Sequence, residues 1–233
     1  MSFVRNMIDR HPAFIINCLK LLSAVPFMNN IKRKGKGNKI YNRGLLKNCK
    51  IRIIGNRNKI VIGDFSRLIN TKITILGDDN VVDFSSFVYM QDGDIYIEDS
   101  KGKIKVGEHT TFSGRTHLAC IEGRTISIGE RCLFSSNVTL RTGDSHSILD
   151  MQGNRTNASQ DIRISNRVWI GNSVIVLKGV NIAEDSIVAT GSLVTKTCRQ
   201  PNVILGGVPA KIIKENIKWL VERVPLNIAT KEE

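Results

Sequence analysis

The chain has 233 residues, of which 41% are hydrophobic, enough for one domain with a core, and its 19 glycines and 5 prolines exclude a collagenous protein. A net charge of +13 predicts anionic partners, but the cations look dispersed apart from one short run and are not interleaved with aromatic residues, which argues against nucleic-acid binding. Five scattered cysteines without a CxxC pair predict reduced thiols in a cytoplasmic protein, with no disulfide or zinc framework.

Residues 1–35 are predicted to form a helical segment of one or two helices ahead of the main domain. The apolar patch over residues 13–22 is interrupted by Asn17 and Lys20 and is too short to cross a bilayer. No clear small-residue cleavage site follows it, so it indicates helix and not a signal peptide. The basic run KRKGKGNK (32–39) comes next, which leaves open a peripheral contact between this segment and a membrane.

A repeating pattern is predicted from about residue 36 to 208. GNRNKIVIG (55–63) and GDDNVVDFS (77–85) are related segments 22 residues apart, and GKGNKI (35–40) resembles an earlier, degenerate copy. A six-residue period then becomes visible in VGEHTT, FSGRTH and LACIEG, and in IGERCL, FSSNVT and LRTGDS. The first positions of these hexads are large and apolar: Val106, Phe112, Leu118, Ile128, Phe134 and Leu140.

From residue 164 the period is regular, in ISNRVW, IGNSVI, VLKGVN, IAEDSI, VATGSL and VTKTCR. The first position is always Ile or Val, and the fifth is small or β-branched. A period of six fits neither an amphipathic helix nor an alternating strand, and it is the signature of the hexapeptide β-helix. Three hexads make one triangular coil, first-position side chains stack inside, and backbone hydrogen bonds join successive coils. Independent hairpins would not produce this register.

The polar segment 141–163 interrupts the period. Ile128 and Ile164 both occupy first positions but are 36 residues apart, where one coil needs 18, so about 18 residues are predicted to leave the wall as a loop. This loop carries His146. At the other end, within residues 209–233, AKIIKENIKWLVERV predicts a C-terminal helix that closes the column.

The segments VWIGNSVIVLKGVNIAEDSIVATGSLVTK (168–196) and GGVPAKIIK (206–214) resemble the left-handed β-helix hexapeptide acyltransferases. The DSHSI loop and VWIG are most similar to the bacterial capsule, sialic-acid and O-antigen O-acetyltransferases. The resemblance implies an all-β, left-handed parallel β-helix, a homotrimer, and acetyl-CoA as co-substrate in a groove between adjacent columns. It also implies acetyl transfer to a hydroxyl of a bacterial cell-surface saccharide, and the net charge is expected to attract both the donor and an acidic polymer.

His146 is the predicted catalytic base of this reaction. An alcohol that attacks a thioester must lose its proton, and a neutral imidazole suits that transfer near neutral pH. Asp144 and Asp150 flank His146, and two interpretations of them stay open. Either one of the two carboxylates orients the imidazole ring, or both residues cap turns of the loop. The other three histidines are interpreted as structural or solvated, and no metal site is predicted: His11, His109 and His117.

Trp169 occupies the sixth, outward position of its hexad. An aromatic side chain there predicts a subunit contact, and the resemblance implies that it also shapes the acetyl site against the thioester arm of CoA. The resemblance places further CoA contacts at Asn172, Thr190, Thr195, Lys196, Lys211 and Lys214. Thr190 departs from the usual alanine or glycine. Lys211 and Lys214 stand where some relatives have arginine, so they supply charge to the phosphates without a bidentate fork.

Two other functions remain as alternatives. An N-acetyltransferase of an amino sugar nucleotide would share the fold and the donor, but its relatives often carry an N-terminal βαβ domain that is not recognisable here. A noncatalytic β-helix scaffold is the second. A metal enzyme on this fold needs converging histidines, whereas His109 and His117 fall in a different coil from His146.

Overall fold

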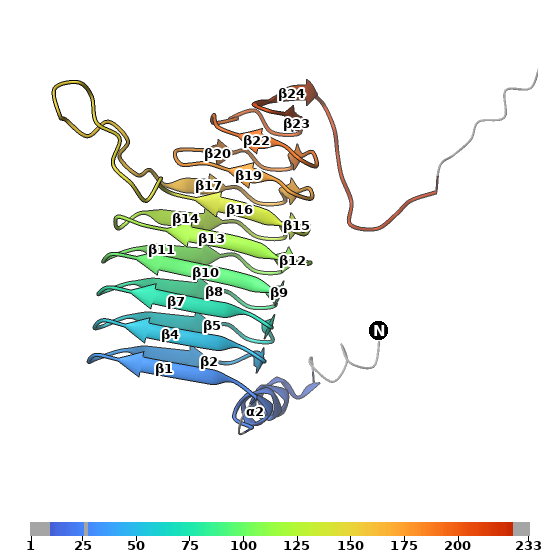
Figure 1. Ribbon diagram of the computed structural model, residues 1–233. Coiled ribbons are helices and arrows are strands. Elements are labelled where there is room, and N and C mark those ends of the chain that lie inside the picture. The colour runs from blue at the N-terminus through green and yellow to red at the C-terminus, as the bar shows by residue number, and fades with distance from the viewer. Residues whose placement is uncertain (1–9, 26–27, 226–233) are drawn as a thin grey trace, which may run out of the picture.

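The computed structural model describes residues 10–25 and 28–225 and shows a three-sided column of stacked coils with one long loop on its side (Figure 1). The strands form three sheets, here called faces A, B and C, which are parallel apart from the last strand of face C. Face A comprises β1 (Asn30–Lys34), β4 (Lys50–Ile54), β7 (Lys72–Leu76), β10 (Gly93–Glu98), β13 (Thr116–Cys120), β16 (Val138–Arg141), β19 (Ile175–Val176) and β22 (Leu193–Val194). Face B comprises β2 (Lys39–Asn42), β5 (Lys59–Ile62), β8 (Val81–Phe84), β11 (Lys103–Val106), β14 (Thr125–Ile128), β17 (Ile162–Ile164) and β20 (Asn181–Ile182). Face C comprises β3 (Leu45–Lys47), β6 (Arg67–Ile69), β9 (Tyr89–Gln91), β12 (Thr111–Phe112), β15 (Leu133–Phe134), β18 (Trp169–Ile170), β21 (Ile187–Val188), β23 (Ile204–Gly207) and β24 (Ala210–Lys214).

The two repeat lengths of the sequence are two coil sizes in the structure. In the lower coils Lys50 pairs with Lys72, 22 residues later, and in the upper coils Ile175 pairs with Leu193, 18 residues later. The lower coils have longer strands, which accounts for the additional residues. The β-helix already begins at Asn30, ahead of the predicted boundary at residue 36, because β1 pairs in parallel with β4.

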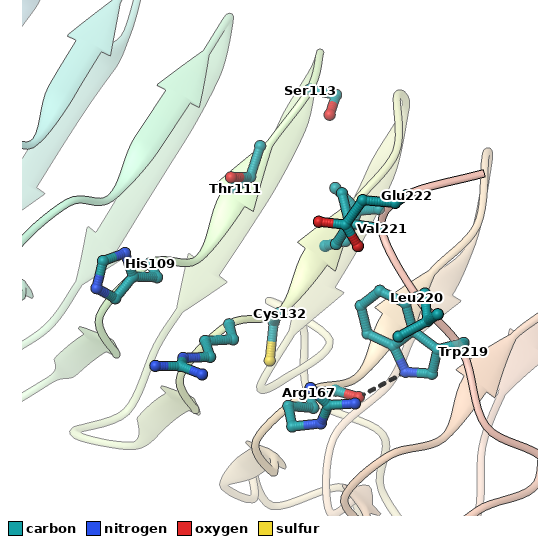
Figure 2. A pocket seen from close by; sticks show the side chains of 11 residues that line it. His109, Thr111, Ser113, Cys132, Arg167, Trp219, Leu220, Val221 and Glu222 are labelled. Atoms are coloured by element: carbon teal, nitrogen blue, oxygen red, sulfur yellow. Dashed lines mark hydrogen bonds between the residues drawn. The ribbon is translucent and has the colours of Figure 1, made fainter. Parts of the chain in front are cut away.

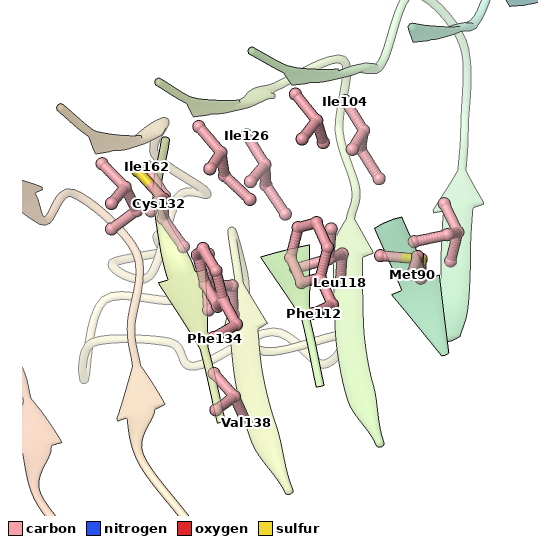
Figure 3. Close-up of a cluster of buried hydrophobic side chains, with 14 of the residues drawn as sticks. Met90, Ile104, Phe112, Leu118, Ile126, Cys132, Phe134, Val138 and Ile162 are labelled. Carbon is pink, nitrogen blue, oxygen red and sulfur yellow. The ribbon is translucent and has the colours of Figure 1, made fainter. Parts of the chain in front are cut away.

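The core is a stack of aliphatic and aromatic side chains along the axis of the column (Figure 3). Phe112 and Phe134, on successive coils, stack with ring centroids 4.6 Å apart. The first-position residues of the regular hexads are at most 1% exposed, as predicted: Ile164, Ile170, Val176, Ile182, Val188 and Val194. Cys132 also serves as core filler, and its burial raises the pKa of the thiol to about 11.

The recurring GxxN pattern of the lower coils is explained by a ladder of buried asparagines. Asn58 donates from Nδ2 to the carbonyl oxygen of Gly77 at 2.8 Å and accepts from the backbone N–H of Asn80 at 2.9 Å. The same side chain also donates to Oδ1 of Asn38 at 3.0 Å. Gly55, with φ 135°, lies so close to the next coil that a Cβ atom would be 1.9 Å from the carbonyl oxygen of Gly77. Glycine and asparagine are therefore required at this corner.

The predicted N-terminal helix is present as α2 (Pro12–Ser23), which contacts β3 at the lower end of the column, whereas residues 30–34 of the predicted helical segment form β1. Residues 1–9 and 26–27 of that predicted segment lie outside the described residues. Within the described residues no helix has the length and apolar character needed to cross a bilayer.

The predicted C-terminal helix is wrong for the described residues. Ala210–Lys214 forms β24, which pairs antiparallel with β23, and residues 215–225 continue without a helix. The physical reason is the open edge of the last coil, whose backbone groups need partners that a folded-back strand supplies. The remainder of the predicted segment, residues 226–233, lies outside the described residues.

We expect Asn58→Ala to lower the free energy of unfolding by roughly 2–4 kcal/mol, because it leaves buried backbone groups of Gly77 and Asn80 without partners. Urea denaturation measures the change. Asn181→Ala is the matched control: its side chain is exposed on a strand, and the expected loss is below about 0.5 kcal/mol. Equal losses in the two variants would contradict the ladder as a stabilising element.

Candidate active site

The interruption of the repeat is a loop, residues 142–161, that leaves the column between β16 of face A and β17 of face B (Figure 1). Ile128 and Ile164 are register partners in adjacent strands although 36 residues separate them, which confirms the predicted extrusion. Beyond its base the loop is a short hairpin, in which Leu149 and Arg155 form an antiparallel bridge. The wall therefore continues undisturbed while the loop extends outward.

Asn157 holds the part of this loop that carries His146. Its side chain is 7% exposed, and its Nδ2 donates to the carbonyl oxygen of His146 at 2.7 Å and to Oδ2 of Asp144 at 2.9 Å. Its Oδ1 accepts from the backbone N–H of Ile148 at 2.8 Å. One buried amide thus fixes the backbone at and beyond His146. Sequence reasoning missed Asn157, because an asparagine in a polar segment carries no periodic signal.

Two ion pairs tie the loop to the coils on either side of it. Lys178, in the corner that follows β19, pairs with Asp144 and also donates to the carbonyl oxygen of Asn157 at 3.1 Å. Arg155 pairs with Glu122 of the coil below, with 2.6 Å between Nη2 and Oε1. The bond from Lys178 is the main reason that the pKa of Asp144 lies below its ordinary value, so this carboxylate stays ionised.

Asp144 and Asp150 both have the contacts of loop-capping residues. The carboxylate of Asp144 bonds Lys178 and Asn157, and that of Asp150 accepts from the backbone N–H groups of Gln152 and Asn154 at 3.0 and 2.8 Å. Neither carboxylate has a hydrogen bond to the imidazole of His146 among the described residues. Orientation of that ring by Asp144 stays a prediction.

Trp169 begins β18 on face C and is half-buried, between its register partners Leu133 and Ile187. Its ring lies 6.1 Å from that of Trp219, which the C-terminal segment brings back along the column. Trp219 is 8% exposed and donates from Nε1 to the carbonyl oxygen of Arg167 at 2.8 Å. The sequence placed Trp219 in a helix and missed this contact.

A hollow of about 590 Å³ lies beside Trp219, along face C and its corner with face B (Figure 2). Its floor includes Thr111 and Ser113 of the column, and the C-terminal segment forms one side with Leu220 and Glu222. His109, which the sequence interpreted as structural or solvated, lines one end and stacks on Phe87 with ring centroids 4.8 Å apart. This hollow is an elongated groove on the outside of the column.

His146 and Trp169 are not brought together within one chain. In a triangular cross-section the corner between faces A and B, where the loop leaves, is opposite face C, where Trp169 lies. In Figure 1 the loop leaves the column on the left, whereas β12 and β15 of face C lie on the right. The side chain of His146 is exposed on the loop. A site that contains both residues therefore needs two neighbouring columns.

The predicted CoA contacts fall into separate groups. Asn172 and Thr190 are exposed and stack one coil apart at the corner after face C, where the N–H of Gly191 donates to the carbonyl oxygen of Asn172 at 2.8 Å. Lys196 and Lys211 line one hollow of about 220 Å³ at the upper end of the column. The remaining two, Thr195 and Lys214, are exposed near that end.

Repeated parallel coils around an apolar core, with one extruded loop, define a hexapeptide β-helix, and comparison with known proteins identifies the family. The chain is 31% identical over 168 residues to a polysialic acid O-acetyltransferase of Neisseria meningitidis, covering 72% of this chain and 77% of the relative. The crystal structure of the polySia-specific acetyltransferase NeuO matches with a TM-score of 0.77 and 30% identity over 87% of this chain and 92% of that one. The crystal structure of the polysialic acid O-acetyltransferase OatWY matches with a TM-score of 0.77 and 28% identity, over 86% of this chain and 94% of that one. No family model matches the chain.

The chain belongs to the hexapeptide-repeat O-acetyltransferases, whose fold is the left-handed β-helix. It is therefore an O-acetyltransferase, and the alternative of a noncatalytic scaffold is not supported. The family predicted from the VWIG and DSHSI segments is confirmed.

We expect Asn157→Ala to lower kcat for acetyl transfer about 10- to 100-fold with little change in the KM for acetyl-CoA, because it displaces His146, the predicted base, from its position for the acceptor hydroxyl. Steady-state kinetics measure both constants. Asn154→Ala changes the same residue type in the same loop without touching the contacts of Asn157, and should stay within about threefold of the parent. A parent-like kcat for Asn157→Ala would show that the clamp is not needed.

Proposed function

We propose that the chain transfers the acetyl group of acetyl-CoA to a hydroxyl of a bacterial cell-surface saccharide, with His146 as the general base. The observation that carries the proposal is the anchored loop, which holds a single exposed histidine outside the column of a hexapeptide-repeat O-acetyltransferase. The imidazole takes the proton of the hydroxyl as the oxygen attacks the thioester carbonyl. The C–S bond then breaks, and the departing CoA thiolate takes the proton from the imidazolium.

The proposed site is assembled in a homotrimer, with columns side by side. This arrangement lets the loop of one chain reach face C of the next, where Trp169 shapes the acetyl site. The opposite placement of His146 and Trp169 on one column supports it. The five cysteines are free thiols, in keeping with action in the cytoplasm.

The proposed donor site uses the groups predicted for CoA. Lys196 and Lys211 converge on one hollow at the upper end of the column and offer charge to the phosphates, with Lys214 close by in sequence. Asn172, Thr190 and Thr195 line the path toward the thioester. Trp169 lies at the start of that path, so its indole contacts the pantetheine arm.

The proposed acceptor is an acidic capsular polymer of the polysialic acid type. The three relatives above, each named for polysialic acid, support it at about 30% identity over most of the chain. We also propose a peripheral membrane contact through the basic N-terminal segment that includes KRKGKGNK (32–39).

We expect His146→Ala to lower acetyl transfer to polysialic acid about 10²- to 10⁴-fold, because the hydroxyl then has no base. Thiol release from acetyl-CoA, measured with polysialic acid and with neutral saccharides, reports both the base and the acceptor class. His117→Ala, a control on face A, should remain within about threefold of the parent. Transfer by His146→Ala within a few-fold of the parent would exclude His146 as the base.

We expect the double variant Lys196→Ala, Lys211→Ala to raise the KM for acetyl-CoA about tenfold with little effect on kcat, since the phosphates lose two charged contacts. The same variant should handle acetyl-pantetheine, which lacks the nucleotide phosphates, as the parent does. Lys103→Ala with Lys105→Ala removes equal charge from face B and serves as the control. An equal rise in KM for acetyl-CoA and acetyl-pantetheine would show that Lys196 and Lys211 do not bind the nucleotide phosphates.

A further inference from the structure

The net charge of the chain is concentrated at one end of the column. Residues 10–63 contain 13 lysines and arginines and no acidic residue. The whole chain has 34 lysines and arginines, so 21 remain elsewhere, equal to its 21 aspartates and glutamates. The complete excess of +13 therefore lies in α2 and the first coils, far from the loop that carries His146 (Figure 1). The lysines and arginines are spread along the chain apart from KRKGKGNK (32–39), and it is the lack of acidic residues in 10–63 that concentrates the net charge.

Helix α2 is attached to the first coil by one of its sides. Ile16 is 6% exposed, and Oγ of Ser23 accepts from the backbone N–H of Leu46 in β3 at 2.9 Å. Asn29, just after the helix, donates to the carbonyl oxygen of Leu46 and accepts from the N–H of Cys49, at 2.9 and 2.8 Å. The helix is thus held across the lower end of the core.

The other side of α2 is apolar and exposed. Phe14 and Leu21 are 64% and 71% exposed, and Val25, just after the helix, is 43% exposed. At 100° per residue these three positions form one stripe, which lies on the side of the helix away from Ile16 and Ser23. A helix that covers a core needs one apolar side, and no contact within residues 10–25 and 28–225 explains the second one.

The first coil, to which α2 is attached, carries exposed cations without an acidic partner in the part of the chain that the structure describes. Lys32, Arg33 and Lys34 of β1 and Lys36 in the following turn are all exposed, and none of them has a salt bridge within residues 10–25 and 28–225. Arg43 and Arg57, by contrast, pair with Asp64 and Asp79 of the coil above. The lowest coil therefore keeps its positive charge at the same end of the column as the apolar stripe (Figure 1).

We propose that this end of the column docks on an anionic lipid surface, with the stripe of α2 in the interfacial region and the cations of β1 on the headgroups. An anionic lipid surface uses both features, the apolar stripe and the positive charge. An acidic polysaccharide would bind the cations but leave the apolar stripe exposed. Another protein chain could cover the stripe, but its contact would not require the cations. The proposal extends the proposed trimer, because three parallel columns present three such ends in one plane and bind with avidity. From β1 to β16 there are five strand spacings of roughly 4.8 Å, so the active-site loop stands ~24 Å above the lipid.

The test is co-sedimentation of the full chain with vesicles, in the absence of acetyl-CoA and acceptor. We expect binding to phosphatidylcholine vesicles that contain phosphatidylglycerol, and at least tenfold weaker binding to phosphatidylcholine alone. Leu21→Glu should lower the affinity for anionic vesicles at least tenfold, and Lys34→Glu with Lys36→Glu should do the same. The matched controls are Ile213→Glu, 64% exposed at the opposite end, and Lys103→Glu with Lys105→Glu on face B; they should bind like the parent.

Three outcomes would overturn the proposal. The parent could fail to bind anionic vesicles, the controls could lose as much affinity as the variants of the lower end, or Leu21→Glu could change the number of subunits and leave vesicle binding intact. That last result would make the stripe a subunit contact. Circular dichroism and transfer to a soluble acceptor establish that the variants are folded. Since sedimentation needs no acetyl transfer, failure of the lipid contact and failure of the proposed enzyme activity are distinguishable.

Discussion

The register between successive coils is the constraint on which the rest of this molecule depends. Each strand in the interior of a face bonds to the strand one coil below and to the strand one coil above, so each residue must lie over an equivalent one. Phe134 over Phe112 and Asn80 over Asn58 are direct results of that requirement. Extra residues can leave the wall only at a corner, because an insertion within a strand would shift every side chain after it to the opposite face.

The active-site loop uses this constraint. It leaves at a corner, and residues of three successive coils hold it: Glu122 below, its own Asn157, and Lys178 above. The rigidity of the column is thereby transmitted to the backbone that carries His146, although the loop itself has few apolar contacts. Trp169 lies on the opposite face, so the proposed site with both residues needs two neighbouring columns, which is the physical argument for the proposed assembly.

The column also separates tasks along its length. The lowest coils hold all of the net charge and an exposed apolar stripe, the middle and upper coils hold the loop and Trp169, and the end is closed by the antiparallel pair of β23 and β24. Such a separation is natural in a repeat architecture, since each coil contacts only its neighbours and can change its outer residues without disturbing the distant ones. A membrane contact at one end and acetyl transfer higher up are compatible for that reason.

The sequence by itself determined the sixfold and 22-residue periods, the buried positions from Ile164 onward, the length of the extruded loop and the family, because these are local patterns that repeat. Only the tertiary structure decided what the non-repeating parts do. Residues 210–214 became a strand in place of the predicted helix because an unpaired sheet edge lay within reach. Trp219 and Asn157 received their partners from residues up to 52 positions away in sequence, which no period records. The structure also decided which side of α2 is exposed, because the contact between Ser23 and Leu46 fixes the side that faces the column.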